Sequence, residues 1–170
     1  MDNCFSVWFV PGKKDKEYLD KIIKDLANKY DSPIFIPHLT LFVDVKAGEE
    51  NLKSTVDEIF ANVKPFKIKK KGLNQSENFY KTAFIEFENN DYFKDLFNAL
   101  SEKIEQRDFS TFKPHLSLIY KTLPEKERIN IINSLDIKNE FTIGNVYINR
   151  NDPNDYPNVN GWKIIYKKTF

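Results

Sequence analysis

The sequence predicts an α+β fold of two lobes, in which two sheets face each other across a central cleft and the helices lie outside. Hydrophobic residues alternate along the chain between strand-like and helical spacing, and the order of these segments in the first half recurs in the second. At 170 residues, of which 41% are hydrophobic, the chain is long enough to bury one core. We therefore expect a single bilobal domain over residues 1–170, with duplicated halves at about 1–75 and 76–170.

The first half reads as strand, helix, motif strand, helix and strand. Pro11-Gly12 ends an opening apolar run, and apolar residues at helical spacing follow it. The expected elements are a strand over 5–10, a helix ending near 30, an extended run over about 35–45, a helix from about 49 and a strand over about 65–70.

The second half repeats this order and then adds a loop and one more strand. Its helices again show one apolar face at helical spacing. The expected elements are a strand over 80–88, a helix from 91, a second motif strand, a helix from about 125, a strand over 137–149, a polar turn-rich loop over 151–157 and a strand over 162–168.

Both histidines of the chain lie in near copies of one motif. The copies are Pro37-His38-Leu39-Thr40-Leu41 and Pro114-His115-Leu116-Ser117-Leu118, and the offset of 115 minus 38, or 77 residues, is close to half the chain. Ser and Thr together are 15 of 170 residues, so a hydroxyl two places after both histidines is about a one-in-a-hundred coincidence. The repeat therefore indicates a symmetric pair of functional groups.

Strand geometry places the polar residues of each motif together, because successive side chains point to opposite faces. A pseudo-twofold relation between the lobes would bring both polar faces to the cleft, with two imidazoles and two hydroxyls around one small volume. By this alternation His38, Thr40 and Phe42 share one face and Leu39, Leu41 and Val43 the other, while His115 and Ser117 share a face with Leu116 and Leu118 behind them.

Two imidazoles suit in-line displacement at phosphorus, since one ring can accept a proton from water while the other donates one to the leaving oxygen. The hydroxyls of Thr40 and Ser117 would donate to phosphate oxygens whose charge grows in the transition state. This chemistry requires no metal and no cofactor. The alternatives are two histidines satisfied in the core, a metal site that lacks further ligands in the motifs, and a Ser117 nucleophile, which the Thr in the first copy disfavours.

The motif pair resembles the signature of the two-histidine phosphoesterases, and the resemblance spans nearly the whole chain. It is strongest to the cyclic nucleotide phosphodiesterases of plants and fungi, through the segments Ser6-Val7-Trp8-Phe9-Val10-Pro11, Phe35-Ile36-Pro37-His38 and Phe79-Tyr80-Lys81-Thr82. The resemblance implies hydrolysis of ADP-ribose 1″,2″-cyclic phosphate, which arises from tRNA splicing, and of nucleoside 2′,3′-cyclic phosphates. The products implied are the 1″- or 2′-phosphates.

The same resemblance implies roles for six residues. His38 and His115 would be catalytic, and Thr40 and Ser117, the latter in place of the commoner Thr, would bind phosphate. Tyr120 would lie near the substrate, which requires the strand to bulge or end there. Trp8 would lie at the cleft, where base stacking and core packing are equal alternatives.

Charge and cysteine content restrict the partners. With 26 Lys and Arg against 25 Asp and Glu, the chain has no global basic field of the kind that gathers long nucleic acids, so we expect a small nucleotide ligand. The single cysteine, Cys4, and the lack of a leader or an apolar span indicate the cytoplasm, with the nucleus as an alternative. We also expect a monomer.

The resulting functional hypothesis is a metal-independent cyclic phosphodiesterase that acts on ribose cyclic phosphates. A phosphodiesterase or ribonuclease of the same superfamily that processes RNA ends is the first alternative, and a nucleotide-binding module without turnover is the second. The sequence leaves open which histidine is the base and which the acid.

Overall fold

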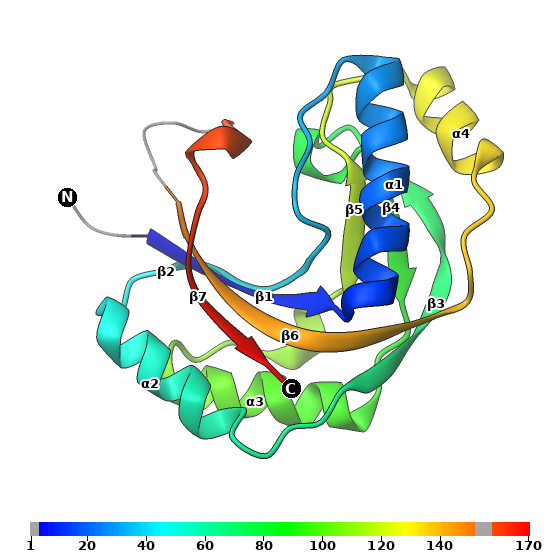
Figure 1. The fold of residues 1–170 in the computed structure, drawn as a ribbon. Coiled ribbons are helices and arrows are strands. Elements are labelled where there is room, and N and C mark those ends of the chain that lie inside the picture. Colours follow the sequence, from blue (N-terminus) through cyan, green and yellow to red (C-terminus); the bar gives the residue numbers. More distant parts are fainter. Residues whose placement is uncertain (1–3, 152–157) are drawn as a thin grey trace.

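The computed structural model describes residues 4–151 and 158–170 and shows an α+β fold with helices outside a bent sheet (Figure 1). The element order matches the strand and helix order that the sequence predicts for both halves. The elements are β1 (Cys4–Pro11), α1 (Lys13–Tyr30), β2 (Leu39–Val45), α2 (Glu49–Ile59), β3 (Phe66–Gln75), β4 (Ala83–Phe87), α3 (Asp91–Lys103), β5 (His115–Ile119), α4 (Glu125–Ser134), β6 (Glu140–Asn151) and β7 (Lys163–Thr169), with short 3-10 turns at Phe79–Lys81, Phe109–Thr111 and Val159–Gly161.

The seven strands of the described residues are joined in one antiparallel sheet, in the order β1-β2-β5-β4-β3-β6-β7 with a further β1–β6 pairing. The predicted α+β class is confirmed, and the two sheets expected from the sequence are connected. The connection is the long strand β6, whose residues 140–143 pair with β3 while residues 145–150 pair with β7. Because one strand serves both lobes, they cannot move apart without breaking its ladders.

The pairing scheme is symmetric under exchange of the halves. β1 pairs with β2 and β6, just as β4 pairs with β5 and β3. Two further ladders, β2–β5 and β3–β6, each join equivalent strands, and the seventh ladder of the described residues, β6–β7, has no counterpart because β7 lies beyond the repeated elements. A duplication of halves 1–75 and 76–170 stays a prediction, and this exchange of strands is the pattern that a duplication expects.

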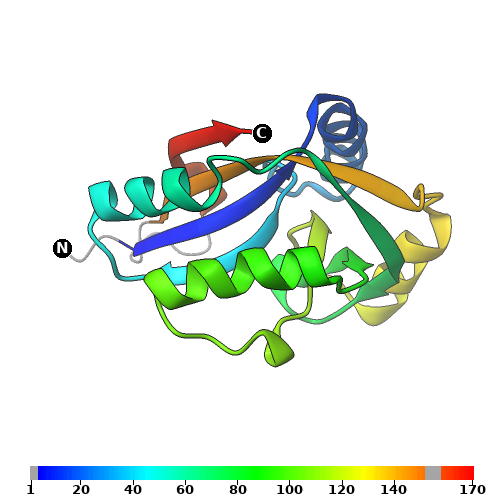
Figure 2. The same ribbon diagram turned by 90° about the horizontal axis from the view of Figure 1, so that it is seen from below.

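The helices cover the outside of the two lobes. Helices α2 and α3 contact each other beside β1 and β2, whereas α1 and α4 lie beside β3, β4 and β5 (Figures 1 and 2). Helix α1 is held to the sheet at its start, because the buried Asp15 carboxylate accepts the Thr142 N–H at 2.6 Å and contacts the Lys138 ammonium. Asn90 caps α3 by accepting the Phe93 N–H at 2.7 Å.

Two groups of buried hydrophobic residues fill the interior. The larger one includes Phe9, which meets Phe60, Phe66 and Phe93 edge to face at 5.3–5.9 Å. The smaller one consists of Ile23, Phe35, Tyr120 and Val159, with Phe79, Tyr80 and Trp162 packed against it. It forms a second cluster, rich in aromatic rings and separate from the larger one.

Two predicted segments differ from the structure in their bounds. Strand β3 continues to Gln75, and residues 79–81 form a 3-10 turn instead of the start of a strand. The turn forms because the Asn78 side chain accepts the Tyr80 N–H at 2.9 Å, which diverts the chain before β4 begins at Ala83. Of the predicted loop over 151–157, residue 151 ends β6, and 152–157 lie outside the described residues.

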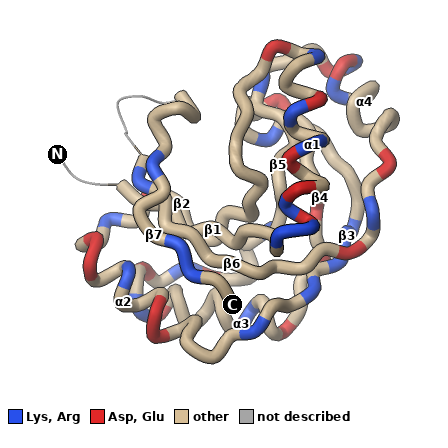
Figure 3. Tube along the Cα trace, in the orientation of Figure 1, with Lys and Arg blue, Asp and Glu red and all other residues tan. Residues whose placement is uncertain are grey.

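Acidic and basic residues are interspersed along the helices that face outward, as on α1 and α2 (Figure 3). Among the described residues, none of the helices has both the length and the apolar character that a membrane crossing needs.

Gly144 lies where β6 passes from β3 to β7, against the backbone of Gly12. A Cβ at residue 144 would sit 3.0 Å from the Gly12 Cα, so Gly144→Ala forces two backbones apart. We expect it to lower the free energy of unfolding by about 1–3 kcal/mol, measured as a shift in the urea midpoint. The matched control is Gly72→Ala in β3, where a Cβ meets nothing within 4 Å and stability should not fall; equal losses in both variants would contradict this account.

Candidate active site

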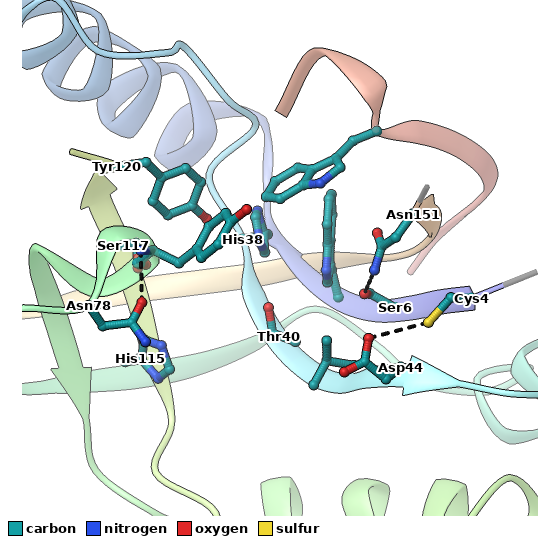
Figure 4. A pocket seen from close by; sticks show the side chains of 14 residues that line it. Cys4, Ser6, His38, Thr40, Asp44, Asn78, His115, Ser117, Tyr120 and Asn151 are labelled. Carbon is teal, nitrogen blue, oxygen red and sulfur yellow. Dashed lines mark hydrogen bonds between the residues drawn. The ribbon is translucent and has the colours of Figure 1, made fainter. Parts of the chain in front are cut away.

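A cavity of about 530 Å³ lies between the lobes, and all six site residues predicted from the sequence line it (Figure 4). The structure thus brings together His38 and Thr40 from the first motif, His115 and Ser117 from the second, and the aromatic residues Trp8 and Tyr120. The other lining residues are Cys4, Ser6, Val43, Asp44, Asn78, Tyr80, Asn151 and Trp162.

The two motifs meet where β2 pairs with β5. The register partners are Leu39 and Leu116, the residues that directly follow each histidine. Continued by one residue, this antiparallel register sets His38 opposite Ser117 and His115 opposite Thr40. The pairing therefore brings the two motifs side by side.

Each histidine is held through the carbonyl that precedes its proline. The Nδ1 atom of His38 is 2.6 Å from the Ile36 carbonyl oxygen, and the Nδ1 atom of His115 is 2.9 Å from the Lys113 carbonyl oxygen. A carbonyl can only accept, so Nδ1 carries a hydrogen in both rings. Nε2 is then the atom of each ring that can exchange a proton with a ligand.

Burial gives both imidazoles a lower pKa than a free imidazole has. Burial is the main cause that lowers the pKa of His38 to about 4, and the charge of His115 lowers it further. The hydrogen bond to the Ile36 carbonyl acts in the opposite direction and raises this pKa. Burial also lowers the pKa of His115, opposed by the Lys113 carbonyl and Glu86 and assisted by Lys81. His38 is 6% exposed and is neutral at physiological pH.

An aromatic residue on the neighbouring strand supports each imidazole. Trp8 is the register partner of Thr40, and its ring stacks on His38 with 3.8 Å between centroids and 13° between planes. Phe84 is the register partner of Ser117, and its ring meets His115 at 5.5 Å. Because Trp8 is 2% exposed and one face covers His38, we infer that it chiefly positions that imidazole.

The two hydroxyls are not equivalent. Thr40 is half-buried, whereas Ser117 is buried and donates from Oγ to the Tyr80 carbonyl at 2.6 Å. The 3-10 turn at residues 79–81 places that carbonyl. To donate to a phosphate oxygen, the Ser117 hydroxyl must rotate its hydrogen away from the carbonyl.

The predicted alternation of side chains between the two faces of the strand holds at His38 and Thr40 and fails at Phe42. Phe42 is fully buried, and its ring stacks on Phe97 with 4.9 Å between centroids. Val43 lines the cavity instead and is 45% exposed. The register between β1 and β2 shifts twice beyond Thr40, so β2 carries extra residues and its faces are exchanged there.

Tyr120 meets the condition that the sequence set for it, because β5 ends at Ile119 and Tyr120 follows the last strand residue. Its ring stacks on Phe35 at 3.7 Å and meets Trp162 at 5.9 Å. Trp162 also stacks with Tyr80 at 6.2 Å. The sequence analysis did not predict Trp162 as a site residue. It lies outside both copies of the histidine motif, and its only distinction in the sequence is that it is one of two tryptophans.

Cys4 lines the far end of the cavity, where its thiol donates to the Asp44 carboxylate at 3.3 Å. Burial raises the pKa of the Cys4 thiol to about 11, assisted by Asp44, so the group stays protonated and is a poor nucleophile. Within residues 4–151 and 158–170, no group of three or more His, Cys, Asp or Glu side chains is arranged to hold a metal ion.

Comparisons with known proteins identify the family of the chain. Residues 1–167 match the family model described as "Cyclic phosphodiesterase-like protein". The chain is 21% identical over 128 residues to a cyclic phosphodiesterase of Arabidopsis thaliana, a match that covers 75% of this chain and 71% of that protein.

Solved structures share the fold at low identity. TT0787 of Thermus thermophilus matches with a TM-score of 0.60 and 16% identity, covering 98% of this chain and 97% of that one. LigT of E. coli, complexed with phosphate, matches with a TM-score of 0.56 and 11% identity, covering 98% and 96%. With the family model spanning nearly all of its length, the chain belongs to the cyclic phosphodiesterase-like proteins of the two-histidine phosphoesterase superfamily.

Proposed function

We propose that this protein is a metal-independent cyclic phosphodiesterase that hydrolyses ribose cyclic phosphates by acid and base catalysis at His38 and His115. The observation that carries the proposal is the placement of both imidazoles in one cavity, each with Nδ1 bound to a backbone carbonyl. The substrates proposed are nucleoside 2′,3′-cyclic phosphates and ADP-ribose 1″,2″-cyclic phosphate. The proposal includes no resident metal or cofactor.

The unequal burial of the rings supports one assignment of the proton transfers. His38, the more deeply buried ring, is neutral, so its Nε2 accepts a proton from the attacking water. The water oxygen forms the new bond to phosphorus as the bond to the opposite ribose oxygen breaks. His115, the less buried ring with Glu86 nearby, donates its Nε2 proton to that leaving oxygen. A 2′,3′-cyclic phosphate opened at O3′ leaves the 2′-phosphate.

The hydroxyls act on the phosphate oxygens that do not leave. Thr40 and Ser117 line the same cavity as the two imidazoles, so both hydroxyls can donate to the oxygens of one phosphate. Donors fixed before the reaction stabilise the added charge of the transition state. A cyclic phosphate anion in the cavity also raises the pKa of both imidazoles, which loads His115 with its proton.

The aromatic residues are suited to the nucleoside. Trp162 and Tyr80 line the cavity, where Trp162 meets both His38 and Tyr80. Stacking of a base on such rings is worth about 1–3 kcal/mol. The E. coli LigT structures include complexes with 3′-AMP and ATP, and the Arabidopsis relative is named for cyclic phosphodiester cleavage. A nucleotide-sized substrate is consistent with these relatives and with the cavity volume.

The proposal is tested by incubating the purified protein with EDTA and a panel of 2′,3′-cyclic nucleotides and ADP-ribose 1″,2″-cyclic phosphate. We expect turnover that EDTA does not reduce, with 2′- and 1″-phosphate products resolved by chromatography. Absence of turnover for every member would favour a nucleotide-binding module, and loss of turnover with EDTA would favour a metal site.

Removing either imidazole should abolish most of the rate. We expect His38→Asn and His115→Asn each to lower kcat about 10²- to 10⁴-fold, because each removes one proton transfer. Asn retains an N–H that can donate to the carbonyl before the proline, so the fold is kept, as circular dichroism should verify. Near-normal activity in either variant would refute the pairing.

The hydroxyls should contribute less than the imidazoles. Thr40→Val and Ser117→Ala should each lower kcat by about tenfold to a thousandfold, measured with a saturating cyclic nucleotide. A larger loss than in the histidine variants would show that the hydroxyls have another role.

The pH dependence follows from the direction of the two pKa shifts. In the free enzyme the base His38 titrates near 4 and the acid His115 below 6.5, so kcat/KM should rise through about pH 4 and fall before pH 6.5. The bound phosphate moves the falling limb of kcat to higher pH than that of kcat/KM. His115→Asn should lose the falling limb; retention of that limb would exchange the assigned roles.

A further inference from the structure

The end of the cavity away from His115 is polar (Figure 4). Four side chains line it: Cys4, Ser6, Asp44 and Asn151. The Cys4 thiol donates to the Asp44 carboxylate at 3.3 Å, and the Asn151 amide donates to the Ser6 hydroxyl oxygen at 2.8 Å. None of these side chains has a part in the proposed proton transfers, so this end is available for another part of the substrate.

A bulge in β2 sets Asp44 across from Ser6. The register pairs on either side of the bulge join residue 5 to residue 45 and residue 7 to residue 42. Between these pairs β1 has the single residue Ser6, whereas β2 has two, Val43 and Asp44. Asp44 has a φ of 57°, in the left-handed region that Asp and Asn adopt more readily than other side chains. The bulge therefore brings the Asp44 carboxylate to the wall of the cavity.

Ser6 has a hydrogen to donate. Its side chain is 3% exposed, and a chain of hydrogen bonds ends at it: the Asn149 amide donates to the Asn151 side-chain oxygen, and the Asn151 amide donates to Ser6 Oγ. Because Ser6 Oγ already accepts, its own hydrogen needs an acceptor, and none of the described residues supplies one. A buried hydroxyl in this state gains a hydrogen bond when a ligand presents an acceptor to it.

Asp44 can only accept. One of its oxygens accepts from the Cys4 thiol. The second oxygen has no hydrogen bond from residues 4–151 and 158–170, and the carboxylate has no salt bridge with any cation among them. An ionised carboxylate accepts two parallel N–H donors from a planar group well. The polar end thus presents one donor, Ser6, across from one acceptor, Asp44.

This end lies within reach of a base whose phosphate is at the imidazoles. Cys4, Ser6 and Trp8 alternate with buried residues along β1, which pairs with β6 in unbroken register there, so the three share one face. Ser6 is two residues from Trp8, a distance of about 7 Å along the strand. Since Trp8 stacks on His38, a nucleoside held by its cyclic phosphate at His38 can extend its base edge to Ser6.

We propose that Ser6 and Asp44 form a subsite that recognises the edge of a guanine base. Guanine has two adjacent N–H donors, N1–H and the N2 amino group, beside the acceptor O6. Asp44 accepts from the two donors and Ser6 donates to O6. Adenine, cytosine and uracil lack this pair of donors, so a lone pair of each would face the carboxylate. The inference rests on the proposed function and adds a base preference to it.

The test compares the 2′,3′-cyclic phosphates of guanosine, inosine, adenosine and uridine. We expect kcat/KM for the guanosine substrate to exceed that for the adenosine substrate about tenfold to a hundredfold, mainly through KM, as one or two hydrogen bonds to a charged group allow. Inosine keeps O6 and N1–H but lacks the N2 amino group, so its value should lie between the two.

The variants are Asp44→Asn and Ser6→Ala, with Asp25→Asn on the exposed face of α1 as a control of equal charge change. Asn also tolerates the left-handed backbone at residue 44. Asp44→Asn should lower the guanosine-to-inosine ratio of kcat/KM about three- to tenfold. Ser6→Ala should leave that ratio unchanged, because both bases have O6, and should lower the guanosine-to-adenosine ratio by a similar factor. Asp25→Asn should change neither ratio.

The outcomes separate this inference from the proposed function. If all four substrates react equally well, if adenosine is preferred, or if both site variants slow every substrate by one factor, the guanine subsite is wrong while the phosphodiesterase activity stands. If none reacts, calorimetry compares guanosine 2′-phosphate with adenosine 2′-phosphate. Tighter binding of the guanosine compound that Asp44→Asn abolishes would retain the subsite without the catalysis, and equal binding of the two would overturn both proposals.

Discussion

The site depends on one backbone contact, the pairing of Leu39 with Leu116 where β2 meets β5. Both leucines are buried, so the hydrophobic core anchors the two strands from behind while the residues before and after each leucine face the cavity. The contact joins equivalent positions of the two motifs, which makes the arrangement of imidazoles and hydroxyls reciprocal. A shift of one residue in this register would turn both polar faces toward the core.

Burial then determines how the reciprocal residues differ. His38 is covered by Trp8 and lies near Trp162, whereas His115 lies at the mouth of a groove lined by Lys81 and Lys113. The desolvated ring is the weaker base thermodynamically, but it is held neutral and therefore able to accept a proton. The repeat supplies two similar imidazoles, and their surroundings make one of them suited to each direction of proton transfer.

The two sides of the cleft therefore differ in their chemistry. The indole rings of Trp8 and Trp162 lie on the side of His38, and the lysines Lys81 and Lys113 line the groove on the side of His115. A nucleotide has a flat apolar base and charged phosphates, and its two ends match these two sides. In the proposed function, this difference between the two sides orients the substrate in the cleft.

The sequence by itself determined the order of the elements and the candidate residues of the site. The periodicity predicted the strands and helices because local burial patterns are written in residue spacing, and the repeated motif identified His38, Thr40, His115 and Ser117, all of which line one cavity. The resemblance added Tyr120 and Trp8, which line it as well. Only the tertiary structure decided the rest.

The bulges of β2 bury Phe42 and turn Val43 to the cavity. The 3-10 turn over residues 79–81 presents the Tyr80 carbonyl, which accepts the hydrogen bond of the Ser117 hydroxyl. Likewise, Trp162 reaches the cavity from a segment whose local pattern carries no functional signal. Strand register, burial and charge proximity join residues that are far apart in the chain, so spacing along the sequence does not encode them.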